Sequence, residues 1–131
     1  GTSNGVFVTD GSFAGLGLIK NANIRIDVEN GYATKITGGV LAKKLKQQLD
    51  AVGKEARNIA EFGIGTNDSA KLSGVLLEDE KVMGTIHIAL GNNVSMGGSV
   101  NVPLHLDGVV KKPTVWMDGK LLMKDGKLLV A

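Results

Sequence analysis

The sequence predicts an α+β fold in which antiparallel β-sheet predominates and one clear amphipathic helix is present. Three observations lead to this prediction. Short apolar runs alternate with Asn-Gly and Asp-Gly pairs, which are typical of hairpin turns. One stretch, residues 41–52, carries apolar side chains at helical spacing. Nineteen glycines among 131 residues are too many for an all-helical protein.

The first third of the chain predicts three strands. Residues 6–8 form a short β-rich run. Residues 24–29 alternate isoleucine and valine with charged side chains, the period of a half-buried strand. Asn30-Gly31 then predicts a tight hairpin turn, with residues 32–37 as the returning strand.

The helix is predicted from Leu41, Leu45, Leu49 and Val52, which recur every three or four residues. The lysines at positions 43, 44 and 46 fall on its solvent face, and Gly53 can end it. We expect a second helical piece over residues 55–60.

The remainder of the chain predicts short elements joined by turns. We expect strand and loop over residues 61–67, one helical turn over 76–82, a buried strand over 85–90 and a loop over 91–99. Strands at residues 115–117, 121–123 and 128–130 are separated by Asp118-Gly119 and Asp125-Gly126, which predicts a β-meander.

The composition of the chain limits the classes of function that it can have. The length fits a single domain, residues 1–131, and the absence of a starting Met leads us to expect a fragment of a larger protein. A net charge of +2 and five aromatic residues argue against a nucleic-acid partner. The absence of cysteine and of a long apolar run leads us to expect a cytoplasmic protein with no membrane partner.

The two histidines stand in unusual places. His87 interrupts an apolar strand, and Ile86 and Ile88 face away from it. His105 and Asp107 are two residues apart, so both leave one face if their segment is extended.

Two imidazoles and a carboxylate suit a divalent cation, and three protein ligands leave positions open for water or substrate. A shared site requires His87 to lie within about 8 Å of His105 or Asp107. The alternative from spacing alone is a hydrogen-bonded core histidine.

Two further acidic segments are open to interpretation. Glu61 lies between the apolar residues Ala60 and Phe62, where a carboxylate is costly unless it is paired or binds a metal. A surface position at a strand edge is the alternative. The run Glu78 to Glu80 is interpreted as a helix N-terminus.

The motifs IAEFGIGTN, LEDEKVMGTIHIALG and GGSVNVPLHLD, in that order, resemble the signature of the aminopeptidase T (M29-type) metallopeptidases. The tail PTVWMDGKLLMKDG also fits the end of those proteins. The resemblance covers nearly the whole chain and implies that residues 1–131 are the C-terminal part of a larger protein. It implies hydrolysis of N-terminal residues from peptides by divalent cations (Zn, Co or Mn). Its metal ligands map onto Glu61, His87, His105 and Asp107, with Glu61 also as the catalytic carboxylate.

The same resemblance implies partners. A homodimer is expected, together with an N-terminal domain that supplies a further ligand glutamate. The 131 residues alone are therefore expected to be inactive.

A second interpretation remains open. The chain lacks the tyrosine that the peptidases carry shortly after the histidine matching His87. The 2,5-dihydroxypyridine dioxygenases, which share this architecture, are implied to hold one Fe(II) on two histidines and an aspartate. His87, His105 and Asp107 match that set, with a small aromatic molecule as substrate. A third interpretation is a non-catalytic metal-binding or dimerisation domain.

Overall fold

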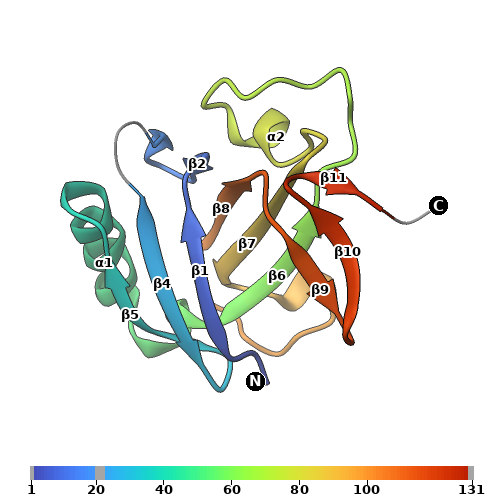
Figure 1. Cartoon of the computed structure of the whole chain (residues 1–131). Coiled ribbons are helices and arrows are strands. Elements are labelled where there is room, and N and C mark those ends of the chain that lie inside the picture. Colours follow the sequence, from blue (N-terminus) through green and yellow to red (C-terminus); the bar gives the residue numbers. More distant parts are fainter. Residues whose placement is uncertain (1, 20–22, 130–131) are drawn as a thin grey trace.

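The computed structural model describes residues 2–19 and 23–129. Within them the predicted α+β class is confirmed: the chain forms three antiparallel sheets and one long helix, α1 (Val40–Val52), which lies at one side of the molecule (Figure 1). No helix in this part of the chain is long and apolar enough to cross a membrane.

The first sheet contains β1 (Gly5–Thr9), β4 (Ile24–Glu29) and β5 (Tyr32–Thr37), with β4 in the middle. Asn30 and Gly31 join β4 to β5 with φ angles of 50° and 83°, the left-handed backbone that this hairpin turn requires. Ile24, Ile26 and Val28 are buried, as their alternation predicts.

The second sheet has five strands in the order β3-β2-β8-β7-β6. Its bounds are β2 (Ser12–Phe13), β3 (Gly17–Leu18), β6 (Ile59–Ile64), β7 (Thr85–Gly91) and β8 (His105–Lys111). The three long strands β6, β7 and β8 lie side by side in the middle of Figure 1. The two short strands β2 and β3 were not predicted, because two-residue strands leave no periodicity to detect.

The third sheet is the predicted meander. It consists of β9 (Val115–Met117), β10 (Lys120–Lys124) and β11 (Lys127–Leu128). Asp118 and Asp125 have φ angles of 50° and 48° at the two turns. Val130, the end of the last predicted strand, lies outside the described residues.

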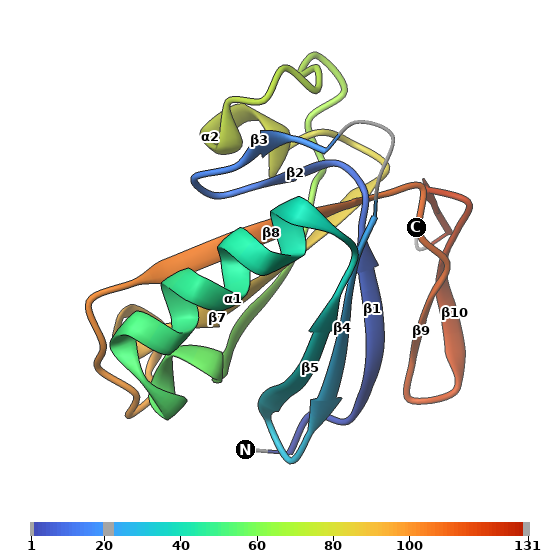
Figure 2. The same ribbon diagram turned by 90° about the vertical axis from the view of Figure 1, so that its left-hand side faces the viewer.

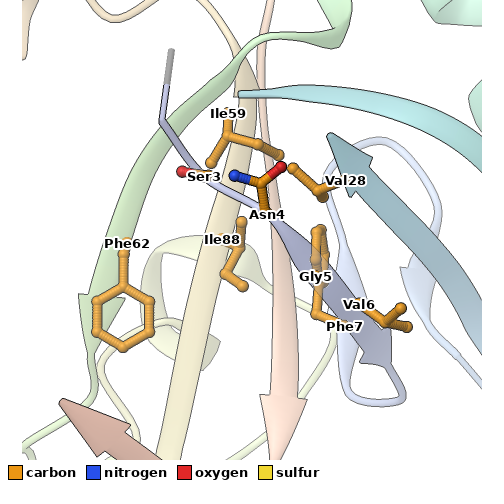
Figure 3. Close-up of a pocket in the computed structure, with 9 residues that line it drawn as sticks. All are labelled: Ser3, Asn4, Gly5, Val6, Phe7, Val28, Ile59, Phe62 and Ile88. Atoms are coloured by element: carbon orange, nitrogen blue, oxygen red, sulfur yellow. The ribbon is translucent and has the colours of Figure 1, made fainter. Parts of the chain in front are cut away.

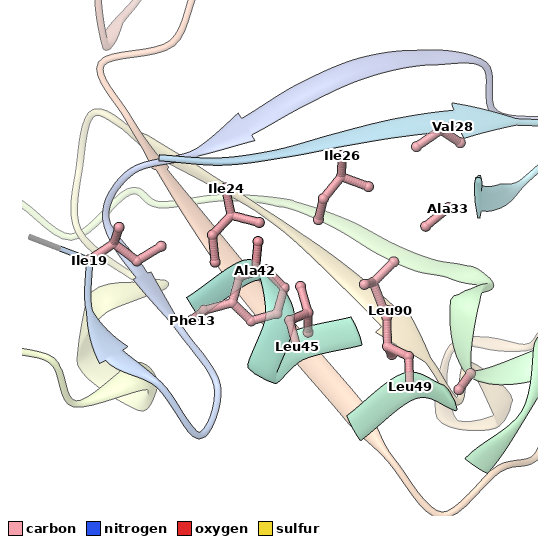
Figure 4. Packing of buried hydrophobic residues seen from close by; sticks show 11 residues of the cluster. Phe13, Ile19, Ile24, Ile26, Val28, Ala33, Ala42, Leu45, Leu49 and Leu90 are labelled. Atoms are coloured by element: carbon pink, nitrogen blue, oxygen red, sulfur yellow. The ribbon is translucent and has the colours of Figure 1, made fainter. Parts of the chain in front are cut away.

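Helix α1 packs on the side of the second sheet that carries Leu90 (Figure 2). Leu45 and Leu49 are fully buried, and Figure 4 shows them beside Leu90 and the isoleucines of β4. The predicted lysines are exposed on the other side of the helix. The amphipathic pattern therefore predicted both the helix and its buried face.

Residues 55–60 do not form the expected helical piece. A short 3-10 helix, η1 (Lys54–Arg57), gives way to β6, which already includes Ile59 and Ala60. Ile59 pairs with Leu90, and the buried side chain of Asn58 donates to the carbonyl of Gly91 at 3.0 Å. Strand pairing with β7 thus overrides the local helical tendency.

Two other predicted elements are confirmed with different bounds: the helical turn is shorter than predicted, and the loop after β7 extends to residue 104. Helix α2 (Leu76–Asp79) covers four residues of the expected turn over 76–82. The loop that follows β7 contains one 3-10 turn, η2 (Val94–Met96).

Candidate metal centre

The predicted site residues converge on one face of the five-stranded sheet. Glu61 and Asp107 both pair with Ala89, from the two sides of β7. His105 pairs with Gly91, and His87 lies two residues before Ala89. Because strand side chains alternate, these positions share a face. The predicted extension of the H-x-D segment is confirmed, since it begins β8.

The carboxylate of Glu61 lies between the two imidazoles. Its Oε1 is 3.3 Å from Nε2 of His87, and its Oε2 is 3.2 Å from Nε2 of His105. The same His105 nitrogen is 3.4 Å from Oδ2 of Asp107. A donor atom of His87 also lies within 4.8 Å of one of Asp107, inside the 8 Å that a shared site requires. Glu61 is partly buried, and β6, which carries it, is an edge strand of its sheet.

Gly63 provides the room that the His87 ring occupies. Gly63 pairs directly with His87 across the sheet. A Cβ atom at this position would collide with Cε1 and Nε2 of the imidazole. Gly63, the first glycine of the EFGIG segment, therefore leaves space for the imidazole ring of His87.

His105 is held with its Nε2 toward the carboxylates. Its Nδ1 is 2.7 Å from the carbonyl oxygen of Asn92, which can only accept, so Nδ1 carries the proton and Nε2 is the nitrogen left to bind a cation. Burial lowers the pKa of His105, but the hydrogen bond to Asn92 and the carboxylates of Asp107 and Glu61 outweigh it and raise the pKa above its usual value.

Asp107 is buried, with 6% of its surface exposed. Burial, together with the neighbouring carboxylates of Glu80 and Glu61, raises the pKa of Asp107, while the two histidines oppose this. Its Oδ1 and Nδ1 of His87 have no hydrogen-bond partner among residues 2–19 and 23–129. Buried polar atoms without partners are costly, and a cation would give Oδ1 a partner. The donor set, imidazole nitrogen with carboxylate oxygen, suits Fe, Mn, Co or Zn.

Glu80 belongs to the same cluster, which the sequence did not indicate. We interpreted Glu78 to Glu80 as a helix N-terminus. In the fold, a carboxylate oxygen of Glu80 lies within 4.8 Å of donor atoms of His87 and Asp107. The available signal was its place in the LEDE motif, seven residues before His87.

The opposite face of these strands is apolar. Phe62 and Ile88, which alternate with the site residues, line a cavity of about 180 Å³ together with Phe7 and Ile59 (Figure 3). This cavity contains none of the clustered donors. The clustered imidazole and carboxylate groups therefore lie on one face of the sheet, and the apolar side chains that pack against the first sheet lie on the other.

Comparison with known proteins identifies the family. The family model of 2,5-dihydroxypyridine 5,6-dioxygenase (NicX) matches residues 12–130. The chain belongs to this family.

Two relatives agree with it. A curated 2,5-dihydroxypyridine 5,6-dioxygenase from Pseudomonas putida is 24% identical over 116 residues, which cover 81% of this chain and 33% of that protein. The solved structure of a 2,5-dihydroxypyridine dioxygenase from the same species superposes with a TM-score of 0.88 at 21% identity, over 99% of this chain and 41% of that one. The chain thus spans about a third of the length of the curated relative.

The expected aminopeptidase T-type family is therefore wrong, and so are the peptidase and hydrolase activities implied by it. The motifs behind that resemblance contain the clustered Glu61, Gly63, His87, His105 and Asp107. Imidazole and carboxylate groups suit divalent cations in hydrolytic and oxidative enzymes alike, so these motifs did not separate the two families.

Proposed function

We propose that this chain is the metal-binding part of an iron-dependent dioxygenase that opens a hydroxylated pyridine ring. The observation that carries the proposal is the convergence of Glu61, His87, His105 and Asp107 on one sheet face, in a chain that belongs to a dioxygenase family. The family match supports ring cleavage as the reaction. The cluster of imidazole and carboxylate groups supports a bound metal ion as the group that carries it out.

Ferrous iron suits sites built from imidazole and carboxylate, and when bound it supplies the one-electron chemistry with O2 that ring cleavage needs. The chain's own residues would hold it. Carboxylate oxygens of Glu61 and Asp107 offset the charge of the cation, and Nε2 of His105 donates its lone pair. His87 adds a second imidazole next to Glu61.

The backbone around the site would orient these ligands. The carbonyl of Asn92 accepts the Nδ1 proton of His105 and keeps the ring in the binding tautomer. The side-chain amide of Asn92 donates to the carbonyl of Val102 at 3.1 Å, which ties the residues after β7 to those before β8. Ligand positions held in this way need little rearrangement on binding.

The test is oxygen consumption by the full-length protein that carries this chain. The protein is purified without oxygen, loaded with Fe(II), and mixed with 2,5-dihydroxypyridine in an oxygen electrode. We expect O2 uptake with loss of the ring's ultraviolet absorbance. His105→Ala and Asp107→Ala should each lower the rate by at least about 100-fold.

The matched control is Glu29→Gln, because Glu29 is an exposed carboxylate on β4. It should retain the wild-type rate. The proposal is overturned if the iron-loaded wild-type protein consumes no oxygen with any hydroxylated pyridine.

A further inference from the structure

The outer edge of β5 is paired along only part of its length. β5 is the last strand of its sheet, so one side of its backbone has no neighbouring strand there. At the start of β5 this side meets residues that follow α1. Tyr32 forms an antiparallel bridge with Asn58, and the guanidinium of Arg57 donates to the carbonyl of Ala33 at 3.0 Å. The outer edge therefore accepts hydrogen bonds from a segment that lies beside it.

This pairing stops after Ala33. Within the described part of the chain, no backbone hydrogen bond reaches residues 34–37 from outside their own sheet. Alternate residues of an edge strand direct their N–H and C=O groups away from the sheet, so an open edge is a template for another strand. At about 3.3 Å per residue, this stretch is about 13 Å long. It has room for a short extended peptide segment.

A groove runs beside the open stretch. It is lined by all the residues of β5, by Lys46 of α1, and by Lys54 and Arg57 of η1. Its volume is about 570 Å³. Helix α1 lies beside β5 in both views of the molecule (Figures 1 and 2). The groove can therefore receive side chains of a strand that is added to β5.

The groove is positively charged. Its lining includes Lys35, Lys46, Lys54 and Arg57, and none of the described residues that line it is acidic. Arg57 pairs with Asp50, which lies outside the groove, at 3.0 Å. The three lysines form no ion pair with any residue that the structure describes. Lysines gathered around a groove without carboxylate partners attract anionic groups.

Two carboxylates border the groove without lining it. Asp27 is the cross-strand neighbour of Lys35, but its Oδ1 is 3.2 Å from the guanidinium of Arg25. Glu55 accepts a hydrogen bond from the tyrosine at the start of β5, where the edge is already paired. Neither carboxylate therefore neutralises the positive charge at the open stretch.

We propose that this surface docks an extended acidic segment of a partner protein, which adds to the open edge of β5 as a further strand. Its backbone pairs with residues 34–37, and its carboxylates lie against Lys35 and Lys46. A lysine on an edge strand deters apolar strands, and its charge selects an acidic one. Nucleic acid lacks the amide groups that such an edge pairs with. The surface contains none of the clustered metal donors, so the inference goes beyond the proposed function.

The experiment uses the full-length protein that carries this chain and a fluorescein-labelled hexapeptide that alternates glutamate with valine. We expect the fluorescence anisotropy of the peptide to saturate below about 1 mM protein at low salt, and the affinity to fall as salt is raised. Hydrogen exchange should show that the bound peptide protects backbone amides of residues 34–37, because strand addition gives them partners.

Charge reversal tests the lysines. Lys35→Glu combined with Lys46→Glu should weaken peptide binding by about 10-fold. The matched control is Lys43→Glu combined with Lys44→Glu, which makes the same change of charge at exposed helix positions outside the groove. It should keep the wild-type affinity. If the first double variant fails to fold, as judged by circular dichroism, Lys46→Ala alone should weaken binding by about 3-fold.

Three results overturn the inference. One is no binding of the acidic peptide, whether or not heparin binds as a general polyanion. Another is equal binding of a peptide with proline in place of valine, since proline cannot donate to a strand. The third is equal affinity of the two double variants. None of these measurements involves metal or oxygen, so ring cleavage succeeds or fails independently of this surface.

Discussion

Glu61 is the residue through which the two imidazoles of the site are connected, since each of its oxygens contacts a different ring. Without a cation, the His105 ring can donate to this carboxylate through Nε2 when the imidazole is protonated. In the proposed metal-bound state, the same oxygens would be available as ligands. The position thus serves the protein in both states, and this explains why a carboxylate is stable between Ala60 and Phe62.

Gly63 offers the sharpest test of how closely the site is packed. In Gly63→Ala the new Cβ would collide with the His87 ring, so the ring must move away from Glu61. We expect the affinity for Mn2+ to fall by about 10-fold or more, as for other changes that misplace a ligand. Isothermal titration of the metal-free variant measures this. An unchanged affinity for Mn2+ would show that the His87 ring can shift to accommodate the new Cβ atom, and would contradict this account.

Tyr32 gives a prediction away from the site. Its hydroxyl lies 3.3 Å from Oε1 of Glu55, and the negative charge of that carboxylate raises the pKa of Tyr32 above 10.0. Since the chain has one tyrosine, absorbance at alkaline pH follows it alone. The wild-type midpoint should exceed 10.0, and Glu55→Gln should bring it down toward that value. Equal midpoints would contradict the assignment of Glu55 as the cause.

The individual ligands were predictable to different degrees. Alternation along a strand is a local rule, so the common face of His105 and Asp107 followed from the sequence. The approach of Glu80 to His87 did not, because it depends on how the segment between β6 and β7 folds back on the sheet. The reaction was not predictable from the ligands either, because the same donors suit a hydrolytic metal and an oxidative one.

At the scale of elements, α1 is held by a small number of leucines. Leu49 is fully buried in the cluster that includes Leu90, whereas Val40 at the start of the helix is 70% exposed. Leu49→Ala should destabilise the protein by about 2–5 kcal/mol through lost burial and the cavity that remains. Val40→Ala should change stability by less than about 0.5 kcal/mol. Urea unfolding measures both, and similar losses for the two variants would contradict this account of the core.

Long periodic elements were the ones that the sequence predicted well. The helix, the β4–β5 hairpin and the C-terminal meander each carry a repeated pattern with a turn signal at the end. The error at residues 55–60 occurred where a segment of mixed composition pairs with a distant strand. Such pairing depends on β7, more than twenty residues later, and no local pattern reports it.

At the scale of the whole molecule, the site connects stability with pH and metal. His105 and Asp107 both have raised pKa values, so the metal-free folded state binds protons more tightly than the unfolded chain does. The stabilisation that these two groups contribute is complete at pH values below their pKa in the unfolded chain. It is lost as the pH rises through their pKa in the folded protein. For His105 the loss therefore begins near its ordinary value of 6.5.

We therefore expect the metal-free protein, kept in EDTA, to lose stability from this site between pH 6 and pH 8. His105→Gln should flatten the loss. Metal should reverse it, because cations bind the deprotonated ligands, and a concentration 100 times the dissociation constant adds about 2.7 kcal/mol. Thermal unfolding at the two pH values tests this. A wild-type slope equal to that of His105→Gln would refute it.

The strand register also has a consequence for how this family can vary in length. Backbone pairing with Gly91 fixes where β8 starts, and the contacts of Asn92 with His105 and Val102 tie this start to the residues after β7. One residue inserted between His105 and Asp107 would turn Leu106 or its neighbour toward the site and remove a ligand. The two-residue interval of the H-x-D segment is therefore fixed by the alternation of side chains along β8 itself.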